Sequence, residues 1–324
     1  MHILVTNDDG PPSTESSPYI LPFVKALEAA GHTVSVIVPD TQRSWIGKAH
    51  IVGQDVRTSP YWPPNDTPAV HTTTDAAVEK DDGSHPWILV NSTPASCAQL
   101  GLSEYFFQSR APIDLVISGP NYGRNTTAVF ALSSGTLGAA LEAAVCGAKA
   151  IALSFAFFDR KTASDIVEEA CQHSVRVCEY LAHKAEWGNG RLYSVNTPLK
   201  AGVKDQKVRW TKMLQNEWLQ GACFQELPPS TSVDGPASEE MRLRRQESNE
   251  GGSDSASGSG TATPSQKWRA RHFKWAPRFT DVYEAVQKAG PGSDGWAVKE
   301  GEVSISAIRA NFMPAGPMEG EVKL

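Results

Sequence analysis

The sequence predicts an α/β protein with a mostly parallel sheet, and three observations support this prediction. Short apolar runs typical of buried strands alternate with segments of helical periodicity through residues 3–195. The first strand, helix and strand fall within residues 3–38, the pattern of a crossover unit that joins two parallel strands. The 324 residues are 40% hydrophobic and 20% charged, so the chain can bury a sizeable core in one large or two small domains.

The first crossover unit begins at the strand predicted for residues 3–6. Apolar residues then recur at helical spacing from Leu21 to Leu27, and Gly31 is the expected end of this helix. The second strand covers residues 33–38. Residues 50–86 are rich in proline, so we expect short strands or loops that pass over the edge of the sheet.

Five further strands are predicted from short apolar runs, at residues 87–90, 113–117, 148–155, 192–195 and 303–308. The run from Ile113 to Ile117 has the clearest pattern of a buried strand. It leads into residues 118–125, a loop rich in glycine and asparagine.

Two helices are predicted from their N-terminal signals. Thr93 before Pro94 is typical of an N-cap and a first helical position, for a helix that reaches about Phe107. Ser134 is the expected start of a helix of small residues that Gly147 closes.

Two more helices are predicted toward the C-terminal end. The spacing of Thr162 and Asp165 resembles a capping box, ahead of a long amphipathic helix that ends near Trp187. A last helix is expected at residues 281–288.

The chain is expected to consist of a core, an insertion and a C-terminal part. The core covers residues 1–227, and residues 267–324 complete the same domain as an extension or hairpin. Residues 228–266 are rich in Ser, Gly, Glu and Thr and almost lack aromatic residues, which predicts a low-complexity disordered insertion. Residues 268–279 interleave basic and aromatic side chains; they could stack on a base, but an edge strand protected by charge is the simpler interpretation.

Charge and cysteine content argue against several classes of protein. The formal net charge of -6 disfavours a protein whose main partner is nucleic acid. The five cysteines form no C-x-x-C pair, which disfavours a zinc ribbon or a disulfide framework and favours a reducing compartment. The sequence shows neither a secretory signal nor an apolar run long enough to span a membrane. We therefore expect a cytoplasmic protein with no membrane partner.

The first predicted strand ends in Asn7, Asp8, Asp9 and Gly10. In open parallel sheets, ligands bind in the crevice beyond the carboxyl ends of the strands. Two adjacent carboxylates repel each other, so a crevice that keeps both ionised favours a bound cation. The alternative is an ordinary turn, since Asp and Gly are common turn residues.

Polar residues also follow the next strands, at the same edge of the predicted sheet. These are Ser44, the run from Asn91 to Thr93, and residues 118–125. Carboxylate, hydroxyl and amide oxygens suit Mg²⁺ or Mn²⁺ better than zinc. The helices that begin near Thr93 and Ser134 would point their N-termini, which favour phosphate, at this edge. The combination predicts metal-assisted hydrolysis of a phosphoester.

Simpler explanations exist for the individual clusters, and two other enzyme classes are disfavoured. Ser44 could be a turn serine, and residues 133–136 could serve only as an N-cap. A dinucleotide oxidoreductase would need a G-x-G-x-x-G sequence after the first strand, which is absent. A phosphatase with a phospho-aspartate intermediate would typically have aspartates where Asn7 and Asp9 stand.

Five motifs, taken in order, resemble the SurE family of survival-protein phosphatases and nucleotidases. They are VTNDDG, QRS, TPASC, SGPNYGRN and SSGTLGAALEA. The SGPN sequence and the Ser/Pro-rich loop after NDDG resemble the fungal branch, and the resemblance covers nearly the whole chain outside the insertion. It implies a three-layer Rossmann-like core and a C-terminal extension that exchanges between partners, and therefore a homodimer or a higher homo-oligomer.

The resemblance also implies a chemistry and a set of site residues. The expected activity is hydrolysis of nucleoside monophosphates, or of a broader range of phosphomonoesters as an acid phosphatase. One divalent cation, Mg²⁺ or Mn²⁺, would be bound by Asp8, Asp9, Ser44 and Asn121. The candidate catalytic residues are Asn7, Asp8 and Asp9. The candidate phosphate- or substrate-binding residues are Ser92, Thr93, Gly119, Asn125, Ser133, Ser134, Gly135 and Thr136.

Two departures from the family pattern bear on substrate preference. Ser92 stands where the family commonly has glycine, and the loop from Pro11 to Pro18 is longer. No histidine is linked to the site by its spacing, so the general acid is not assigned. The alternative function is a catalytically weak, nucleotide- or RNA-linked interaction protein that retains the fold.

Overall fold

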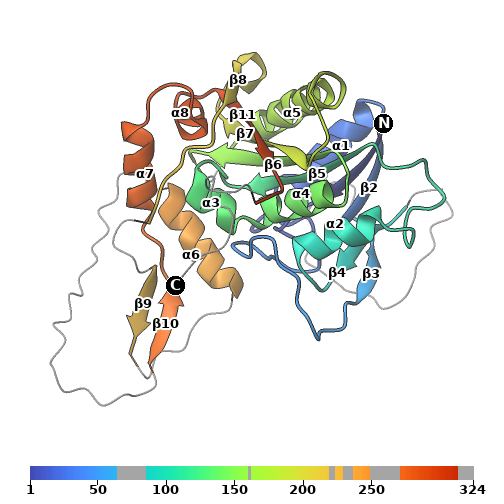
Figure 1. Cartoon of the computed structure of the whole chain (residues 1–324), viewed down its shortest axis with the longest axis horizontal. Helices are drawn as coiled ribbons and strands as arrows, with labels where there is room; N and C mark the ends of the chain where they lie inside the picture. The colour runs from blue at the N-terminus through green and yellow to red at the C-terminus, as the bar shows by residue number, and fades with distance from the viewer. Residues whose placement is uncertain (64–84, 160–161, 219–222, 229–235, 249–270, 313–324) are drawn as a thin grey trace, which may run out of the picture.

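The computed structural model describes residues 1–63, 85–159, 162–218, 223–228, 236–248 and 271–312. Its centre is a nine-stranded sheet in the order β3-β4-β2-β1-β5-β6-β7-β11-β8 (Figure 1). The strands are β1 (His2–Thr6), β2 (Thr33–Pro39), β3 (Thr58–Tyr61), β4 (Trp87–Val90), β5 (Leu115–Tyr122), β6 (Ala150–Phe157), β7 (Arg191–Leu199), β8 (Val208–Thr211) and β11 (Val303–Arg309).

The sheet is mostly parallel, as the sequence predicts. Strands β4, β2, β1, β5, β6 and β7 are parallel neighbours. Strand β3 pairs antiparallel with β4 at one edge, and β11 pairs antiparallel with β7 near the other. The parallel arrangement brings the carboxyl ends of β1 and β5 together, because Thr6 lies opposite Ser118.

Helices cover both faces of the sheet and form a three-layer, Rossmann-like core. Helices α1 (Ile20–Ala29) and α5 (Ser164–Lys184) pack on one face; α2 (Pro94–Leu102) and α4 (Gly135–Val145) pack on the other. Strand β1 shows why: Ile3 and Val5 face the first pair of helices, whereas Leu4 faces the second. Alternating side chains on a strand point to opposite faces, so an apolar run fills both layers of the core.

Several smaller elements lie at the end of the sheet where α3 and α6 meet (Figure 1). Helices α3 (Ala128–Ser133), α6 (Pro236–Ser248) and α7 (Phe279–Lys288) share a small apolar cluster of Val129, Phe130, Leu243, Phe279 and Val282. The hairpin of β9 (Phe224–Leu227) and β10 (His272–Trp275) lies beside them. The remaining helices are η1 (Val203–Asp205) and α8 (Asp294–Lys299).

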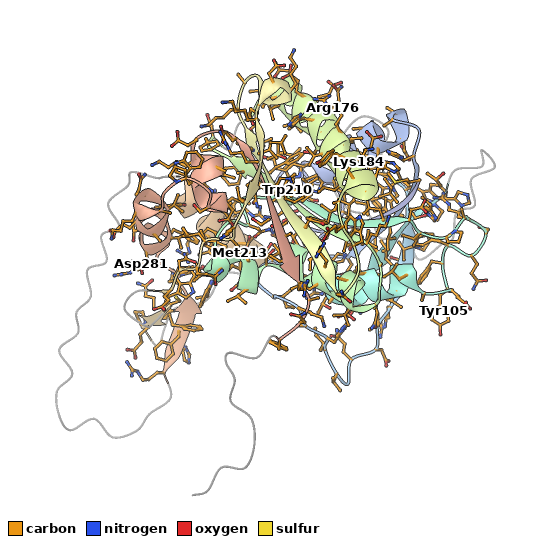
Figure 2. All side chains as sticks on the ribbon, turned by 45° about the horizontal axis from the view of Figure 1, so that its top comes forward. Tyr105, Arg176, Lys184, Trp210, Met213 and Asp281 are labelled. Carbon is orange, nitrogen blue, oxygen red and sulfur yellow. The ribbon has the colours of Figure 1, made fainter. Side chains whose placement is uncertain are left out.

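The far edge of the sheet is strand β8, which carries an exposed Trp210 (Figure 2). Its neighbour β11 is the final strand that the alternating run at 303–308 predicts. Among the described residues, the structure has no helix of the length and apolar character needed to cross a membrane.

The structure corrects four details of the predicted elements. Helix α2 ends at Leu102, not near Phe107. Strand β5 continues to Tyr122, through part of the predicted loop. Helix α5 has no capping box, because its N-cap is Ala163; the hydroxyl of Thr162 donates to the carbonyl of Asp159 instead. Helix α3 and strands β8 and β9 lie in segments to which no element was assigned, whereas β3 is a short strand within the segment at 50–86 where short strands or loops are expected.

The predicted insertion at residues 228–266 contains helix α6. Composition favours disorder there, but α6 gains stability from burial of Leu243 and from ion pairs between residues one turn apart on the helix. Other parts of that interval, and most of the predicted irregular segment at 50–86, lie outside the described residues.

Candidate active site

Asp8 and Asp9 follow strand β1 directly and are both buried, with 2% and 1% of their surface exposed. The backbone N–H of Tyr122, at the end of β5, donates to Asp9 Oδ2 at 2.7 Å. Strand pairing therefore fixes the position of this carboxylate. Burial of a charge costs free energy unless hydrogen-bond donors or a cation stabilise it, so the two carboxylates need such partners.

Helix α4 meets Asp8 at its first turn. The hydroxyl of Thr136 donates to Asp8 Oδ1 at 2.6 Å and lies 3.1 Å from Asn121 Oδ1. A Cβ atom on Gly135 would lie 2.7 Å from the Cβ atom of Asp8, which is closer than real Cβ atoms approach. Only glycine lets α4 begin this close to the carboxylate. Ser134 caps the helix by accepting from the N–H of Leu137 at 3.1 Å.

The end of β5 supplies the opposite wall of the pocket. Gly119 has a φ of +128°, and a Cβ atom there would lie 2.1 Å from the carbonyl oxygen of Leu153, so its role is to let β5 pass beside β6. Asn121 and Asn125 both line the pocket. Asn125 is fixed by its own N–H, which donates to Asn196 Oδ1 at 2.8 Å, and by its amide, which donates to Ser154.

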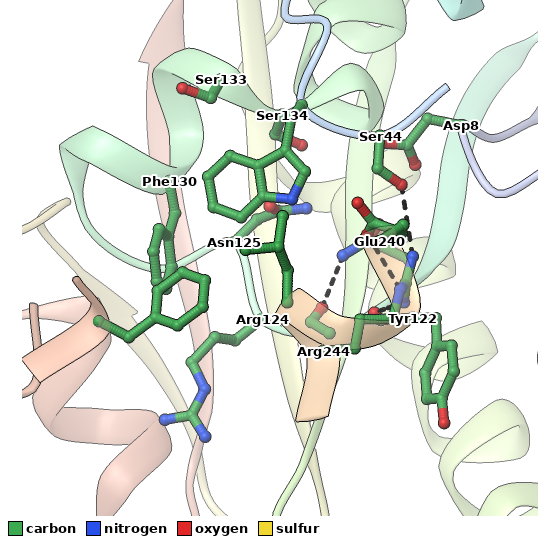
Figure 3. A pocket seen from close by; sticks show the side chains of 15 residues that line it. Asp8, Ser44, Tyr122, Arg124, Asn125, Phe130, Ser133, Ser134, Glu240 and Arg244 are labelled. Atoms are coloured by element: carbon green, nitrogen blue, oxygen red, sulfur yellow. Dashed lines mark hydrogen bonds and ion pairs between the residues drawn. The ribbon is translucent and has the colours of Figure 1, made fainter. Parts of the chain in front are cut away.

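The structure brings six of the predicted site residues into the lining of one pocket. Its lining includes Asp8, Ser44, Asn121, Asn125, Ser133 and Ser134 (Figure 3). Gly135 and Thr136 contact Asp8 from the start of α4.

Three predicted residues point elsewhere. The amide of Asn7 donates to the carbonyl of Gly10 and to the hydroxyl of Ser17, so it stabilises the turn. Thr93 caps α2 and donates to the carbonyl of Ala49, and Ser92 donates to Ser96. None of the three lines the pocket. Their side chains have local structural roles here, and the predicted catalytic and phosphate-binding roles stay untested predictions.

Arg244 and Glu240, both on helix α6, are two charged site residues that sequence reasoning missed. Arg244 Nη2 lies 2.5 Å from Asp9 Oδ1 and 3.3 Å from Ser44 Oγ, and Nη1 donates to the carbonyl of Tyr122. Glu240 pairs with Arg244 Nε at 3.0 Å (Figure 3). The four-residue spacing of Glu240 and Arg244 is typical of a helix and was the one available signal.

Aromatic rings form the outer wall of the pocket. Trp45 lies next to Ser44, and its ring centroid is 5.7 Å from that of Phe130 and 6.0 Å from that of Phe279. Trp45 has a φ of +60°, an unusual conformation for a bulky residue. Such strain persists where surrounding structure enforces it, commonly at functional sites. Sequence reasoning missed this wall because the three rings come from separate segments.

Burial dominates the electrostatics of the site. Burial, with the neighbouring charge of Asp9 second, raises the pKa of Asp8 to about 7. Burial also raises the pKa of Asp9, although the charge of Arg244 opposes that shift. The pKa of Glu240 is raised by burial and again opposed by Arg244. The carboxylates therefore favour a nearby positive charge.

The donor set fits a hard divalent cation. Asp8, Asp9, Ser44 and Asn121 offer only oxygen atoms, and Thr136 links two of them through its contacts with Asp8 and Asn121. Within the described part of the chain, no group of three or more His, Cys, Asp and Glu residues is arranged to hold a metal ion. A cation at this site would thus depend on the Ser44 and Asn121 oxygens as well as the carboxylates.

Comparison with known proteins agrees with the arrangement of the site. The family model "Survival protein SurE" matches residues 3–220. The chain is 37% identical over 155 residues to "5'-nucleotidase SurE 2" of Pyrobaculum aerophilum, covering 48% of this chain and 49% of that protein. It is 32% identical over 199 residues to "5'-nucleotidase SurE" of Desulfovibrio desulfuricans, covering 61% of this chain and 66% of that protein.

A longer relative matches the whole chain. The protein described as "Probable tubulin--tyrosine ligase PBY1" of Saccharomyces cerevisiae is 32% identical over 355 residues, which cover 100% of this chain and 43% of that protein. The chain thus spans less than half the length of this relative and of the Pyrobaculum protein.

The fold comparison agrees with the sequence comparison. The crystal structure of the SurE protein from Aquifex aeolicus superposes with a TM-score of 0.59 at 20% identity, over 97% of this chain and 95% of that one. With a family model that matches residues 3–220 and a sheet of the same architecture, this chain belongs to the SurE family.

Proposed function

We propose that the chain is a divalent-metal-dependent phosphomonoesterase that hydrolyses nucleoside monophosphates. The family includes 5'-nucleotidases, which supports a phosphatase or nucleotidase activity in general. The observation that carries the specific proposal is the buried pair Asp8 and Asp9, against which helix α4 begins. A cation site and an anion site are therefore adjacent, because the carboxylates attract a cation and the N-terminus of α4 attracts an anion.

Asp8, Asp9, Ser44 and Asn121 would hold the metal. Bound there, Mg²⁺ or Mn²⁺ would polarise the phosphoryl oxygen and activate a water molecule. Thr136 keeps one oxygen of Asp8 in place, and the N–H of Tyr122 keeps one oxygen of Asp9 in place. These contacts hold the carboxylates in a fixed geometry before substrate arrives, which lowers the reorganisation needed for reaction.

The first turn of α4 would bind the phosphate. The N–H groups of Gly135 and Thr136 belong to the first turn, where helical donors have no acceptor within the helix. Ser133 and Ser134 add hydroxyl groups that line the same pocket. Together they offer hydrogen bonds to the oxygens that carry charge in the transition state.

The aromatic wall supports a nucleoside as the rest of the substrate. Trp45, Phe130 and Phe279 line the same pocket as Asp8, and the ring of Trp45 lies next to the other two. Stacking of a base on an aromatic ring is worth about 1–3 kcal/mol and tolerates any base. We therefore expect nucleoside monophosphates to be hydrolysed with lower KM than p-nitrophenyl phosphate.

Phosphate release from the purified chain tests this proposal. The assay compares a set of nucleoside monophosphates with p-nitrophenyl phosphate, in Mg²⁺, in Mn²⁺ and after addition of EDTA. The expected result is hydrolysis that EDTA abolishes and added metal restores. Equal hydrolysis in EDTA would contradict the metal-dependent mechanism. Tight nucleotide binding without hydrolysis in either metal would instead support the alternative, an interaction protein that retains the fold.

A further inference from the structure

Helix α6 places a positive charge where the proposed metal would bind. Arg244 contacts Asp9 at 2.5 Å and Ser44 at 3.3 Å, and it also donates to the carbonyl of Tyr122. Its side chain is only 5% exposed. Asp9 and Ser44 are half of the proposed ligand set, so the guanidinium uses the same oxygen atoms that a cation would need.

Arg244 and a divalent cation would compete for these oxygens. Both are positively charged, and the repulsion between charges a few ångströms apart is strong in a buried site. The lone pairs of Asp9 and Ser44 that accept from the guanidinium would also have to turn to the metal. Binding of metal therefore requires Arg244 to move away from Asp9.

Apart from the contacts of Arg244, the described part of helix α6 is held at this position by one buried apolar side chain. Leu243 is 5% exposed and packs in the cluster with Phe130 and Phe279. Arg242 adds a hydrogen bond of 3.2 Å to the carbonyl of Trp275. Helices α4 and α5 of the core bury many more side chains, so a ligand that binds only the open arrangement can shift α6.

The pocket under α6 is too small for the proposed substrate. Glu240, Leu243 and Arg244 all line it, and the remaining cavity is about 40 Å³. Such a cavity holds a few water molecules at most. A nucleoside monophosphate can therefore reach the carboxylates only when α6 has moved.

We propose that α6 is an internal inhibitor that closes the active site by using Arg244 in place of the metal ion. In the closed form, Arg244 neutralises the charge of Asp9, and Leu243 packs against the rings of the aromatic wall. In the open form, α6 leaves, and the metal and substrate can bind. The inference rests on the proposed function, which assigns Asp9 and Ser44 as metal ligands. By linkage, metal binding favours the open form to the same degree that opening of α6 favours metal binding, and loss of Arg244 removes the contact that opposes opening.

Titration with Mn²⁺, followed by the electron paramagnetic resonance signal of the free ion, tests the competition. We expect R244Q to bind Mn²⁺ about tenfold or more tightly than the wild type, within the usual range of coupling between sites. L243A, which keeps the charge of Arg244 but weakens its anchor, should also bind more tightly. R245Q is the matched control, because Arg245 is the next residue on the same helix and is exposed. Its affinity should equal that of the wild type.

A distance measurement tests the movement itself. Spin labels on the exposed Cys146 and on R245C report the position of α6 relative to α4, since the other cysteines are buried. Saturating Mg²⁺ is expected to lengthen the distance between the labels. An unchanged distance in saturating Mg²⁺ would overturn the proposal.

The titration separates failure of this inference from failure of the proposed function. If the wild type binds Mn²⁺ and R244Q and L243A bind it equally or more weakly, the inhibitor is contradicted while the metal site stands. If R244Q raises KM for substrate without a change in Mn²⁺ affinity, Arg244 is a substrate-binding residue and the inhibitor is again contradicted. If neither the wild type nor any variant binds Mn²⁺, both the proposed metal site and the inhibitory role of α6 are contradicted.

Discussion

Donors from two parts of the core hold the carboxylates of Asp8 and Asp9. Tyr122 donates from the end of β5, and Thr136 donates from the start of α4. The guanidinium of Arg244 approaches from α6. Since buried carboxylates are stable only with such partners, the geometry of the site depends on atoms that the first ten residues do not contain.

Substitution of Gly135 by alanine tests the close approach of α4 to Asp8. The new methyl group would lie 2.7 Å from the Cβ atom and 2.9 Å from Oδ2 of Asp8, so the carboxylate or the helix must shift. Because small displacements of catalytic groups cost about 10²-fold in rate, we expect kcat to fall by about that factor. Steady-state kinetics with a nucleoside monophosphate measures the change.

G290A is the control for this substitution, because a Cβ atom on Gly290 would meet nothing within 4 Å. It should keep the wild-type kcat. A wild-type kcat in G135A would show that the contact with Asp8 has no bearing on the reaction.

The raised pKa of Asp8 predicts how the stability of the metal-free protein depends on pH. Burial and the charge of Asp9 raise this pKa to about 7, so the folded state holds the proton more tightly than the unfolded chain. The resulting stabilisation is fully present below the pKa of an unfolded aspartate, about 4, and is lost as pH rises through about 7.

Chemical unfolding in EDTA measures this dependence. We expect the free energy of unfolding to decrease between about pH 4 and pH 7, and D8N to remove part of that slope. D55N, at an exposed position, is expected to retain it. The pKa assignment would be wrong if D8N had the wild-type slope.

At the scale of elements, the N-cap residue of helix α4 contributes both to the stability of the helix and to the pocket. The hydroxyl of Ser134 accepts from the N–H of Leu137 at 3.1 Å and also lies in the lining of the pocket. Its loss weakens the first turn of the helix that contacts Asp8. The cap therefore belongs to the site as well as to the fold.

Paired substitutions of two N-caps distinguish these roles. S134A and S293A each remove a serine cap, at α4 and α8, and each should cost about 1 kcal/mol of stability. Only S134A should raise KM for a nucleoside monophosphate, because only its helix begins at the pocket. Thermal unfolding and steady-state kinetics provide the two readouts. Equal KM in both variants would show that the N-terminus of α4 does not bind the phosphate.

Local signals explain why some elements could be predicted and others could not. Thr93 and Ser134 are N-caps as expected, since a cap is decided by a residue and its next few neighbours. Helix α6 was not predicted, because composition over 228–266 indicates disorder, whereas the helix is held by contacts with Phe130 and Phe279. No local pattern contains such contacts.

At the scale of the whole molecule, the sheet assembles the site from distant parts of the chain. The edge of a parallel sheet brings Asp8, Ser44 and Asn121 to one pocket, so this much follows from the order of strands. Arg244 contacts Asp9 across a separation of 235 residues, and the aromatic wall combines Trp45 with Phe130 and Phe279. Those contacts depend on tertiary packing. The role of residues 267–324 in dimerisation stays a prediction.

The central claim is that Asp8 and Asp9 hold the metal that hydrolyses a phosphomonoester. Phosphate release from a nucleoside monophosphate by D9N, at a Mn²⁺ concentration that saturates the wild type, tests it most directly. We predict that kcat/KM falls by about 10³-fold or more, because D9N replaces a charged carboxylate ligand of the metal by a neutral amide. Thermal unfolding of D9N should show that the fold is intact. Wild-type turnover by a folded D9N would contradict the account.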